Sequence, residues 1–204
     1  GRKRDSRDAT RGNGNGHVEF LVVGGFAETL AGEDVPFDER RQFAERVLGN
    51  TRRMQRIVDD LLDLSRIESG GWVPNPVTID LDGVASDVLA TARDAAAGKG
   101  LSLGRDIAPD APTVHADATA LRQVLSNLVD NAVRHTAKGE VVLFSRRHER
   151  GVSVGVRDTG IGIAAEHLPR IFERFYRVDP GRSREEGGTG LGLAIVKHLV
   201  EAHG

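Results

Sequence analysis

The stretch DATALRQVLSNLVDNAVRHT, residues 117–136, predicts an amphipathic helix with two amide side chains on one flank. Asp117 precedes the first turn, where a carboxylate caps exposed N–H groups. Asn127 and Asn131 are four residues apart, so they share a flank with Arg134. Amide oxygens are ligands that Mg²⁺ accepts beside phosphate, although the pair taken alone fits an exposed helix face better. The buried stripe, spaced by three and four residues, is Leu121, Val124, Leu125, Leu128 and Ala132.

The residues around this helix predict an α/β sandwich, in which a mixed sheet carries helices on one face. The strands at 140–147 and 152–158 are joined by HERG, which favours a hairpin. Between the last strand and the last helix, residues 164–189 are expected to be long and partly irregular. The expected strands are residues 77–81, 101–107, 112–116, 140–147 and 152–158, and the further helices are residues 82–98 and 190–203.

Two glycine-rich segments follow the helix in sequence. DTGIGI (158–163) comes directly after a strand, so Asp158 would project into a cleft, and glycines there let a flat ring approach the backbone. GGTGLGLAIVK (187–197) leads into a helix, whose bare N–H groups favour phosphate. Each segment taken alone also fits a plain turn or hinge. The second is neither a Walker A loop nor a dinucleotide fingerprint, because the spacing differs.

The segment IFERFYRVDPGRSREE (171–186) lies between these two and combines aromatic with basic residues. Its apolar residues would anchor it, and its arginines are candidates for contact with a triphosphate. Any one of these arginines alone is better explained as solvated surface charge. The anchor residues are Ile171, Phe172, Phe175 and Tyr176, and the arginines are Arg174, Arg177, Arg182 and Arg184.

Upstream of residue 77 the pattern is helical. Apolar residues recur at helical spacing over 18–30 and over 38–68, with a turn at 31–37 and a proline-containing linker at 72–76. The fold class is therefore α+β, an antiparallel helical hairpin followed by the sandwich. Two helices cannot bury both of their faces, so we expect a homodimer that forms a four-helix bundle. Packing of the hairpin on its own second domain is the alternative.

Composition narrows the classes of function. The chain has 204 residues, a net charge of −2 and no cysteine, which excludes disulfides and thiolate metal sites and gives no basic field for nucleic acid. No apolar stretch approaches the roughly 20 residues that span a bilayer, and no signal peptide is visible. We expect a cytoplasmic location, with a parent protein anchored in the inner membrane through segments outside this sequence.

The order of the motifs resembles the ATP-binding domain of sensor histidine kinases. NLVDNAVRHT, RDTGIGI, IFERFYR and GGTGLGLAIVK look like its N, G1, F and G2 boxes. That domain belongs to the superfamily shared with gyrase, Hsp90 and MutL. DDLLDLSRIESG (59–70) resembles the end of the family's dimerisation and phosphotransfer hairpin, which separates the chain from those three. The hairpin is most similar to that of phosphate-regulon-type kinases.

The resemblance implies a kinase that uses ATP and Mg²⁺. In this family the γ-phosphoryl group passes to a histidine on the hairpin and then to an aspartate of a response regulator. Asp158 would hold the adenine amine beside Gly160 and Gly162, and Asn131 and Asn127 would bind Mg²⁺.

The resemblance also places the phosphates and a lid. Arg134 and His135 would lie near the phosphates, and residues 164–189 would close over the nucleotide. The other nucleotide-binding residues that it implies are Ile163, Phe172, Arg177, Gly188, Thr189, Gly190, Leu191 and Gly192. The expected domains are a disordered or altered N-terminal segment at 1–17, a hairpin at 18–69, a linker at 70–76 and an ATP-binding domain at 77–204 that is incomplete at its C-terminus.

Two departures from the family pattern bear on activity. The acceptor box reads roughly His-Glu-Leu-Arg-Thr-Pro-Leu, and its histidine would fall near Gly14, inside the repeat GNGNG. His17 is the candidate phosphoacceptor, but Val18 follows it instead of an acidic residue, so an exposed histidine at a frayed helix start is the competing interpretation. The family's ATP domain also continues past the position of Gly204, so we expect its last strands to be missing.

Three functions follow from these observations. The first is the catalytic core of a histidine kinase. The second is a dimeric ATP-binding module without a usable acceptor histidine, which the altered acceptor box favours for this chain. The third, a helical dimerisation element with a vestigial ATP domain, is disfavoured by the intact Asn131, Asp158 and glycine segments.

Overall fold

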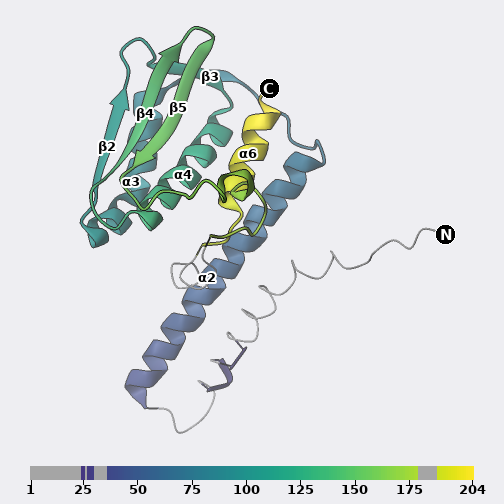
Figure 1. Ribbon diagram of the computed structural model, residues 1–204. Helices are drawn as coiled ribbons and strands as arrows, with labels where there is room; N and C mark the ends of the chain where they lie inside the picture. The colour runs from purple at the N-terminus through teal and green to yellow at the C-terminus, as the bar shows by residue number, and fades with distance from the viewer. Residues whose placement is uncertain (1–23, 26, 30–35, 179–187) are drawn as a thin grey trace, which may run out of the picture. The chain divides into compact units, whose positions relative to one another are not determined.

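The computed structural model describes residues 24–25, 27–29, 36–178 and 188–204, and the chain divides into two compact units, residues 1–62 and 63–204. Of the first predicted helix, residues 24–25 and 27–29 are described and are helical. The second is α2, Phe37–Glu68, as predicted, and it runs from the first unit into the second (Figure 1).

The second unit begins with two strands that each lead straight into a helix. β1 (Val77–Asp80) and β3 (Thr113–Ala116) pair antiparallel as a two-stranded sheet. Asp80 caps α3 (Leu81–Lys99) and Asp117 caps α4 (Ala118–His135). The two caps therefore start α3 and α4 from the same short ribbon, and the predicted cap at Asp117 is confirmed.

The main sheet has the order β2-β4-β5. β2 (Ser102–Ile107) runs parallel to β4 (Glu140–His148), and β4 forms the predicted hairpin with β5 (Gly151–Asp158). The sheet is mixed, as expected, but the predicted single sheet is wrong: β1 and β3 pair with each other and not with it. Each of those strands has only four residues before its helix begins, so the pair forms a separate ribbon.

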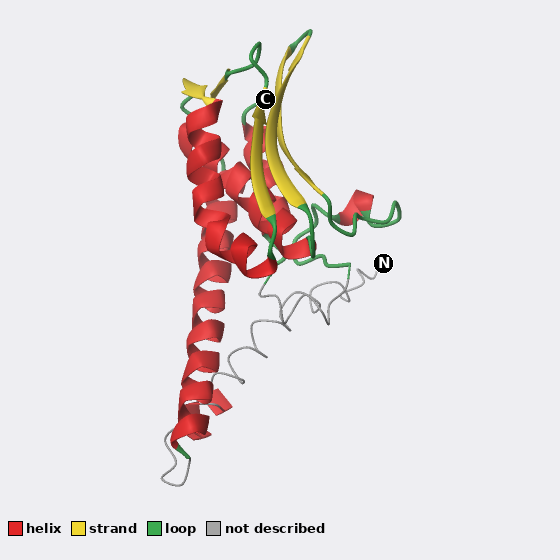
Figure 2. Ribbon diagram, turned by 90° about the vertical axis from the view of Figure 1, so that its left-hand side faces the viewer, coloured by secondary structure: helices red, strands yellow, loops and turns green. Residues whose placement is uncertain are grey.

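The helices cover one face of the main sheet, which Figure 2 shows nearly edge-on. α6 (Gly192–Ala202) buries Ile195 and Leu199, and α4 buries Leu125 and Val129. The core cluster joins α3, α4 and the sheet and consists of Ile79, Val84, Ala85, Val88, Leu89, Ala92, Ala96, Leu101, Leu125, Val129, Ala132, Val133, Val141 and Leu143. This two-layer arrangement fixes α4 against the sheet, and α4 carries the candidate site.

The segment between β5 and α6 is irregular where the structure describes it, as predicted. Its one regular element there is the 3₁₀ turn Leu168–Arg170. The Tyr176 hydroxyl lies 2.7 Å from Nδ1 of His167, and the Arg170 guanidinium lies 4.2 Å from the centre of the Tyr176 ring. These contacts join Tyr176 to the 3₁₀ turn and to the residue that precedes it.

Asp117→Ala is expected to destabilise the second unit by about 1 kcal/mol, the usual cost of losing an N-cap. Asp117 Oδ1 accepts from the N–H groups of Thr119 and Ala120 at 2.9 and 3.0 Å, and Oδ2 accepts from Asn75 N–H at 3.0 Å. Urea unfolding measures the loss, and Asp117→Asn, which keeps an acceptor, should recover most of it.

The same cap predicts a pH dependence. Hydrogen bonds from backbone N–H groups lower the pKa of Asp117 below 3.8. The bond from Ala120 lowers this pKa most, and the bonds from Asn75 and Thr119 lower it less. Because the folded pKa lies below the unfolded one, this stabilisation is complete above the unfolded pKa and is lost as pH falls through the folded pKa. An equal acid sensitivity of wild type and Asp117→Ala would contradict the assignment.

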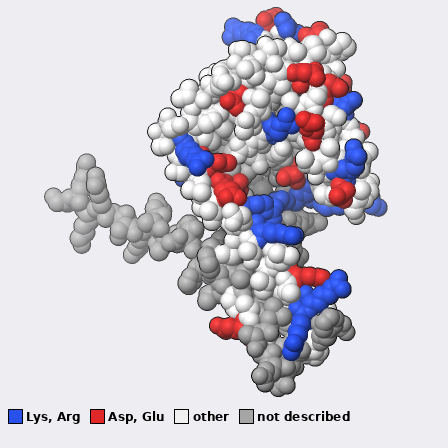
Figure 3. Space-filling model, turned by 180° about the vertical axis from the view of Figure 1, so that it is seen from behind, with Lys and Arg blue, Asp and Glu red and all other residues white. Residues whose placement is uncertain are grey.

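The face of the molecule that Figure 3 shows carries mixed charge. Basic and acidic side chains are interspersed on the face in Figure 3, and neither sign covers it alone. Among the described helices, none combines the length and the apolar character needed to cross a membrane.

Candidate functional site

α4 supplies an amide that lacks a partner. Asn127 is half-buried, and its Nδ2 is buried without a hydrogen-bond partner among the described residues. Its Oδ1 faces the start of α6, where a Cβ on Gly192 would stand 3.4 Å away. A buried amide left unsatisfied costs about 1–3 kcal/mol, so the position fits a ligand that supplies the missing contact. Asn131 is also half-buried, one turn further along the same flank.

Two arginines meet the backbone that precedes α6. Gly188 is buried, and a Cβ there would collide with Nη1 of Arg134 and stand 3.4 Å from Nη2 of Arg177. A Cβ on Gly190 would stand 3.6 Å from Nε of Arg177. The glycines therefore let two guanidinium groups, one from α4 and one from residues 171–178, approach the same stretch of main chain. Two such groups form a site for an anion with several oxygens.

The backbone around Gly190 is held from both sides. Phe175 N–H donates to Gly190 O at 2.8 Å, and a Cβ on Gly190 would stand 3.0 Å from Phe175 Cα. Phe175 itself has a φ of 61°, which is uncommon for a residue other than glycine. Leu191 N–H donates to Thr189 Oγ1 at 3.2 Å, and Leu191 is fully buried. The FERFYR and GTGLGL segments are therefore packed together before α6 begins.

Asp158 ends β5, as predicted, and forms a turn. Its Oδ1 accepts from Gly160 N–H at 2.8 Å, and the residue is exposed. A Cβ on Gly160 would stand 2.6 Å from the carbonyl oxygen of His135, at the end of α4. Only glycine fits this crossing, which brings the carboxylate of Asp158 to the same end of α4 as Arg134. The Oδ2 atom of Asp158 has no hydrogen bond to a described residue that would prevent contact with a ligand.

Lys99 is a contributor to this site that the sequence did not indicate. From the last turn of α3, its Nζ donates to the carbonyl oxygens of Val133 and Arg134 at 2.9 and 2.7 Å. These are terminal carbonyls of α4 that no further turn satisfies, and a cation there is favoured by the helix dipole. Lys99 therefore fixes where α4 ends. A basic residue in a last turn followed by Gly100 was the available signal, but it names no partner.

Two predicted roles in the segment 171–186 differ from what the structure shows. Arg174 forms an ion pair with Glu68, the last residue of α2. Glu68 also lies 3.2 Å from Nε2 of His198 on α6. Phe172 is 41% exposed, so it does not anchor its segment. Both errors arise because the aromatic and basic residues of one segment alternate between different neighbours.

The remaining predicted residues are either exposed or outside the described part of the chain. Ile163 is 43% exposed, and Gly162 has a φ of 68° with open space around it. His17, Arg182 and Arg184 lie outside the described residues.

The donor set fits a nucleotide with its cation. Two guanidinium groups and a glycine cradle suit phosphate oxygens, and Asn127 and Asn131 supply amide oxygens, which Mg²⁺ accepts. The described residues hold no cluster of three or more His, Cys, Asp or Glu that would bind a metal without help from a ligand.

Two family models match the chain. Residues 22–70 match the His Kinase A (phospho-acceptor) domain, and residues 116–204 match the histidine kinase-, DNA gyrase B- and HSP90-like ATPase. The first match begins after His17. Both matches agree with the resemblance inferred from the motifs.

Curated relatives give the same result. The sensor-like histidine kinase SenX3 of Mycolicibacterium smegmatis is 39% identical over 175 residues, which are 85% of this chain and 45% of that protein. The phosphate regulon sensor protein PhoR of Pseudomonas aeruginosa is 37% identical over 186 residues, 90% of this chain and 42% of that protein. The chain thus spans less than half the length of these relatives.

A solved structure extends the comparison to the fold. Full-length ShkA, crystallised in complex with AMPPNP, superposes with a TM-score of 0.70 at 29% identity over 91% of this chain and 39% of that one. The predicted order of a helical hairpin and an α/β domain is therefore confirmed.

Proposed function

The chain belongs to the sensor histidine kinases, and we propose from this premise that it binds Mg²⁺-ATP at α4 and transfers the γ-phosphoryl group to a histidine. The observation that carries the proposal is the meeting of Arg134, Arg177 and the unsatisfied Asn127 at the glycine segment before α6. The AMPPNP bound by the related ShkA supports it.

Each group in the proposed site has a separate task. Asp158 accepts a hydrogen bond from the adenine amine, while Gly160 and Gly162 leave room for the base. Arg134 and Arg177 hold phosphate oxygens at Gly188 and Gly190. His135, Ile163, Phe172, Thr189, Leu191 and Gly192 complete the proposed nucleotide contacts.

Charge dominates the transfer. Asn127 and Asn131 would hold Mg²⁺, which when bound neutralises charge on the transferring phosphoryl group. The arginines hold the triphosphate in one orientation and offset its remaining charge. The bond from phosphorus to the β-phosphate oxygen breaks as a phosphorus–nitrogen bond to imidazole forms, ADP keeps the electron pair, and the imidazole proton passes to water.

We also propose a homodimer. α2 leaves apolar surface exposed in the single chain, which a second copy could cover. The exposed fraction is 38–52% for Leu48, Val58, Leu61 and Leu62. Sedimentation tests this: a particle of 22.0 kDa at micromolar concentration would contradict it.

The next acceptor is an aspartate in a response-regulator receiver domain on the cytoplasmic side. The proposed boundaries are 18–69 for the hairpin, 70–76 for the linker and 77–204 for the ATP domain.

Incubation with Mg²⁺ and γ-labelled ATP tests the catalytic proposal. An acid-labile, alkali-stable label that disappears in His17→Gln identifies His17 as the acceptor. Nucleotide binding without label favours the second candidate, an ATP-binding module without a usable acceptor, which the start of the phospho-acceptor match after His17 supports. Failure to bind nucleotide overturns both functions.

A further inference from the structure

The outer edge of β2 carries backbone groups that no described strand pairs. β2 has β4 as its neighbour on one side and no described strand on the other (Figure 1). Ser102 N–H donates to Gly139 O, so residues 102, 104 and 106 direct their main-chain groups toward β4. Because these directions alternate along a strand, the N–H and C=O groups of Leu103 and Arg105 point away from β4. The edge therefore offers the main-chain donors and acceptors of Leu103 and Arg105, and at its end those of Ile107, to an added strand.

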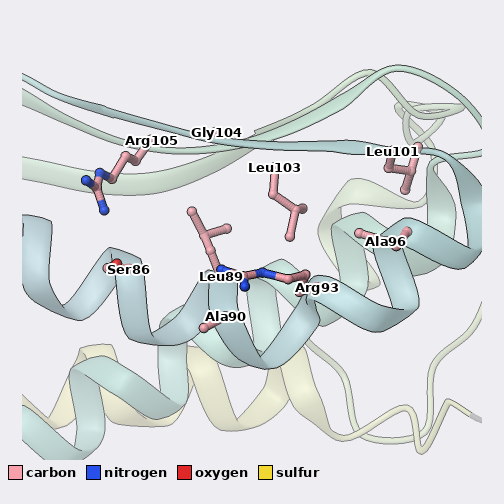
Figure 4. A pocket seen from close by; sticks show the side chains of 10 residues that line it. Ser86, Leu89, Ala90, Arg93, Ala96, Leu101, Leu103, Gly104 and Arg105 are labelled. Carbon is pink, nitrogen blue, oxygen red and sulfur yellow. The ribbon is translucent and has the colours of Figure 1, made fainter.

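A cavity lies beside this edge. It has a volume of about 350 Å³ and opens between β2 and α3. Leu103 points from the strand toward the helix, and Leu89 points from α3 toward the strand (Figure 4). The other lining residues are Ser86, Ala90, Arg93, Ala96, Ala97, Leu101, Gly104 and Arg105. Because the cavity is lined by residues of both β2 and α3, it lies on the face of β2 that packs against α3. An apolar side chain on the same face of a strand added to β2 would lie beside it.

The charge at the cavity is positive. Arg93 is exposed, and its side chain lies along α3 below Leu103 (Figure 4). Arg105 Nε forms an ion pair with Asp82 at 2.8 Å, while its side chain stays 46% exposed. Asp82 neutralises one of the two guanidinium charges, so one positive charge remains for a partner. Apolar lining with a basic rim complements an apolar residue flanked by carboxylates.

We propose that β2 and α3 form a docking site for an extended, acidic segment of a partner protein that adds as a strand beside β2. The backbone of the partner pairs with Leu103 and Arg105, an apolar side chain fills the cavity, and a carboxylate contacts Arg93. A second copy of this chain fits less well, because pairing two β2 edges would bring the arginines of both copies together. A free edge beside a pocket is the surface that strand addition uses.

A blocked octapeptide tests the proposal on the full chain. In this probe every second residue is threonine. The residues between the threonines, which would face α3, are glutamate, leucine, valine and glutamate in that order. Strand addition slows hydrogen exchange of the Leu103 and Arg105 amides severalfold, whereas the Gly104 amide, already bonded to β4, changes little. A peptide with lysine in place of both glutamates is expected to bind about tenfold more weakly.

Variants separate backbone pairing from charge. Arg93→Glu should weaken the glutamate peptide about tenfold and improve the lysine peptide, while Arg150→Glu in the turn between β4 and β5 should change neither. Arg105→Pro removes an outward N–H that makes no bond to β4, and it should bind more weakly than Arg105→Ala, which keeps that N–H. Melting temperatures confirm that the variants are folded.

Two results overturn the proposal. One is unchanged exchange of the Leu103 and Arg105 amides at millimolar peptide. The other is binding that shifts resonances of the cavity residues without slowing those amides, which would make the cavity a site for a small amphiphilic anion and not for a strand. ATP binding plays no part in either measurement, so failure here leaves the proposed kinase function standing.

Discussion

Asp158→Asn is expected to weaken the binding of Mg²⁺-ATP by about ten- to a hundredfold, the cost of losing a hydrogen bond to a charged acceptor. The asparagine Oδ1 can still accept from Gly160 N–H, which lies 2.8 Å from Asp158 Oδ1, so the turn persists. In the proposed binding mode, however, the second oxygen becomes an NH₂ group, which would face the adenine amine with a donor. The substitution thus changes recognition of the base and leaves the local backbone as it is.

Calorimetry with ATP and GTP provides the control. GTP presents a carbonyl oxygen where ATP presents the amine. In Asp158→Asn the affinity for ATP should therefore fall more than the affinity for GTP. Arg134→Ala is the matched contrast, because it should weaken both nucleotides alike. Equal ATP affinity of Asp158→Asn and wild type would show that Asp158 does not read the base.

Gly160→Ala is expected to cost about 1–3 kcal/mol of unfolding free energy, as overpacking does, and to abolish nucleotide binding. The added Cβ would stand 2.6 Å from His135 O and 2.8 Å from Asp158 Oδ1. The first of these atoms belongs to the backbone at the end of α4, which Lys99 holds through the neighbouring carbonyls, so it cannot move aside easily. Either the turn or the helix end must shift.

Gly98→Ala is the control for that variant. Gly98 lies inside α3, and a Cβ added there would meet no atom within 4 Å, so alanine should stabilise the helix by about 0.5–1 kcal/mol. Urea unfolding and nucleotide titration of both variants check the pair. Wild-type stability of Gly160→Ala would mean that the crossing of Gly160 and His135 is looser than the structure shows.

Local signals in the sequence predict most elements of the second unit. The apolar stripe and Asp117 predict α4, whose helix ends at His135 as expected. The separate ribbon of β1 and β3 was not predictable, because the residues 77–81 and 112–116 alternate like any strand and nothing local names the partner. Strand pairing between distant segments depends on the packing of the helices that follow.

The candidate site divides in the same way. The order of motifs predicted that Asn127, Arg134 and the glycines before α6 belong together, and the structure places Asn127 beside Gly192 and Arg134 beside Gly188. The role of Lys99 was not predictable, because a lysine in the last turn of a helix is already explained by its interaction with the dipole of its own helix. Arg174 was misplaced because its partner, Glu68, lies far away in sequence. Long-range polar pairs of this kind leave no periodic trace.

Glu68 has a thermodynamic consequence. This one carboxylate, at the end of α2, contacts Arg174 on one side of the segment that joins β5 to α6 and His198 on α6 itself. A ligand that binds more tightly when those two contacts are made favours the position of the helix end that makes them, and by linkage that position raises the affinity for the ligand by the same free energy. A change in the conformation of α2 and a change in ligand affinity at the glycine segment would then be coupled by the same free energy.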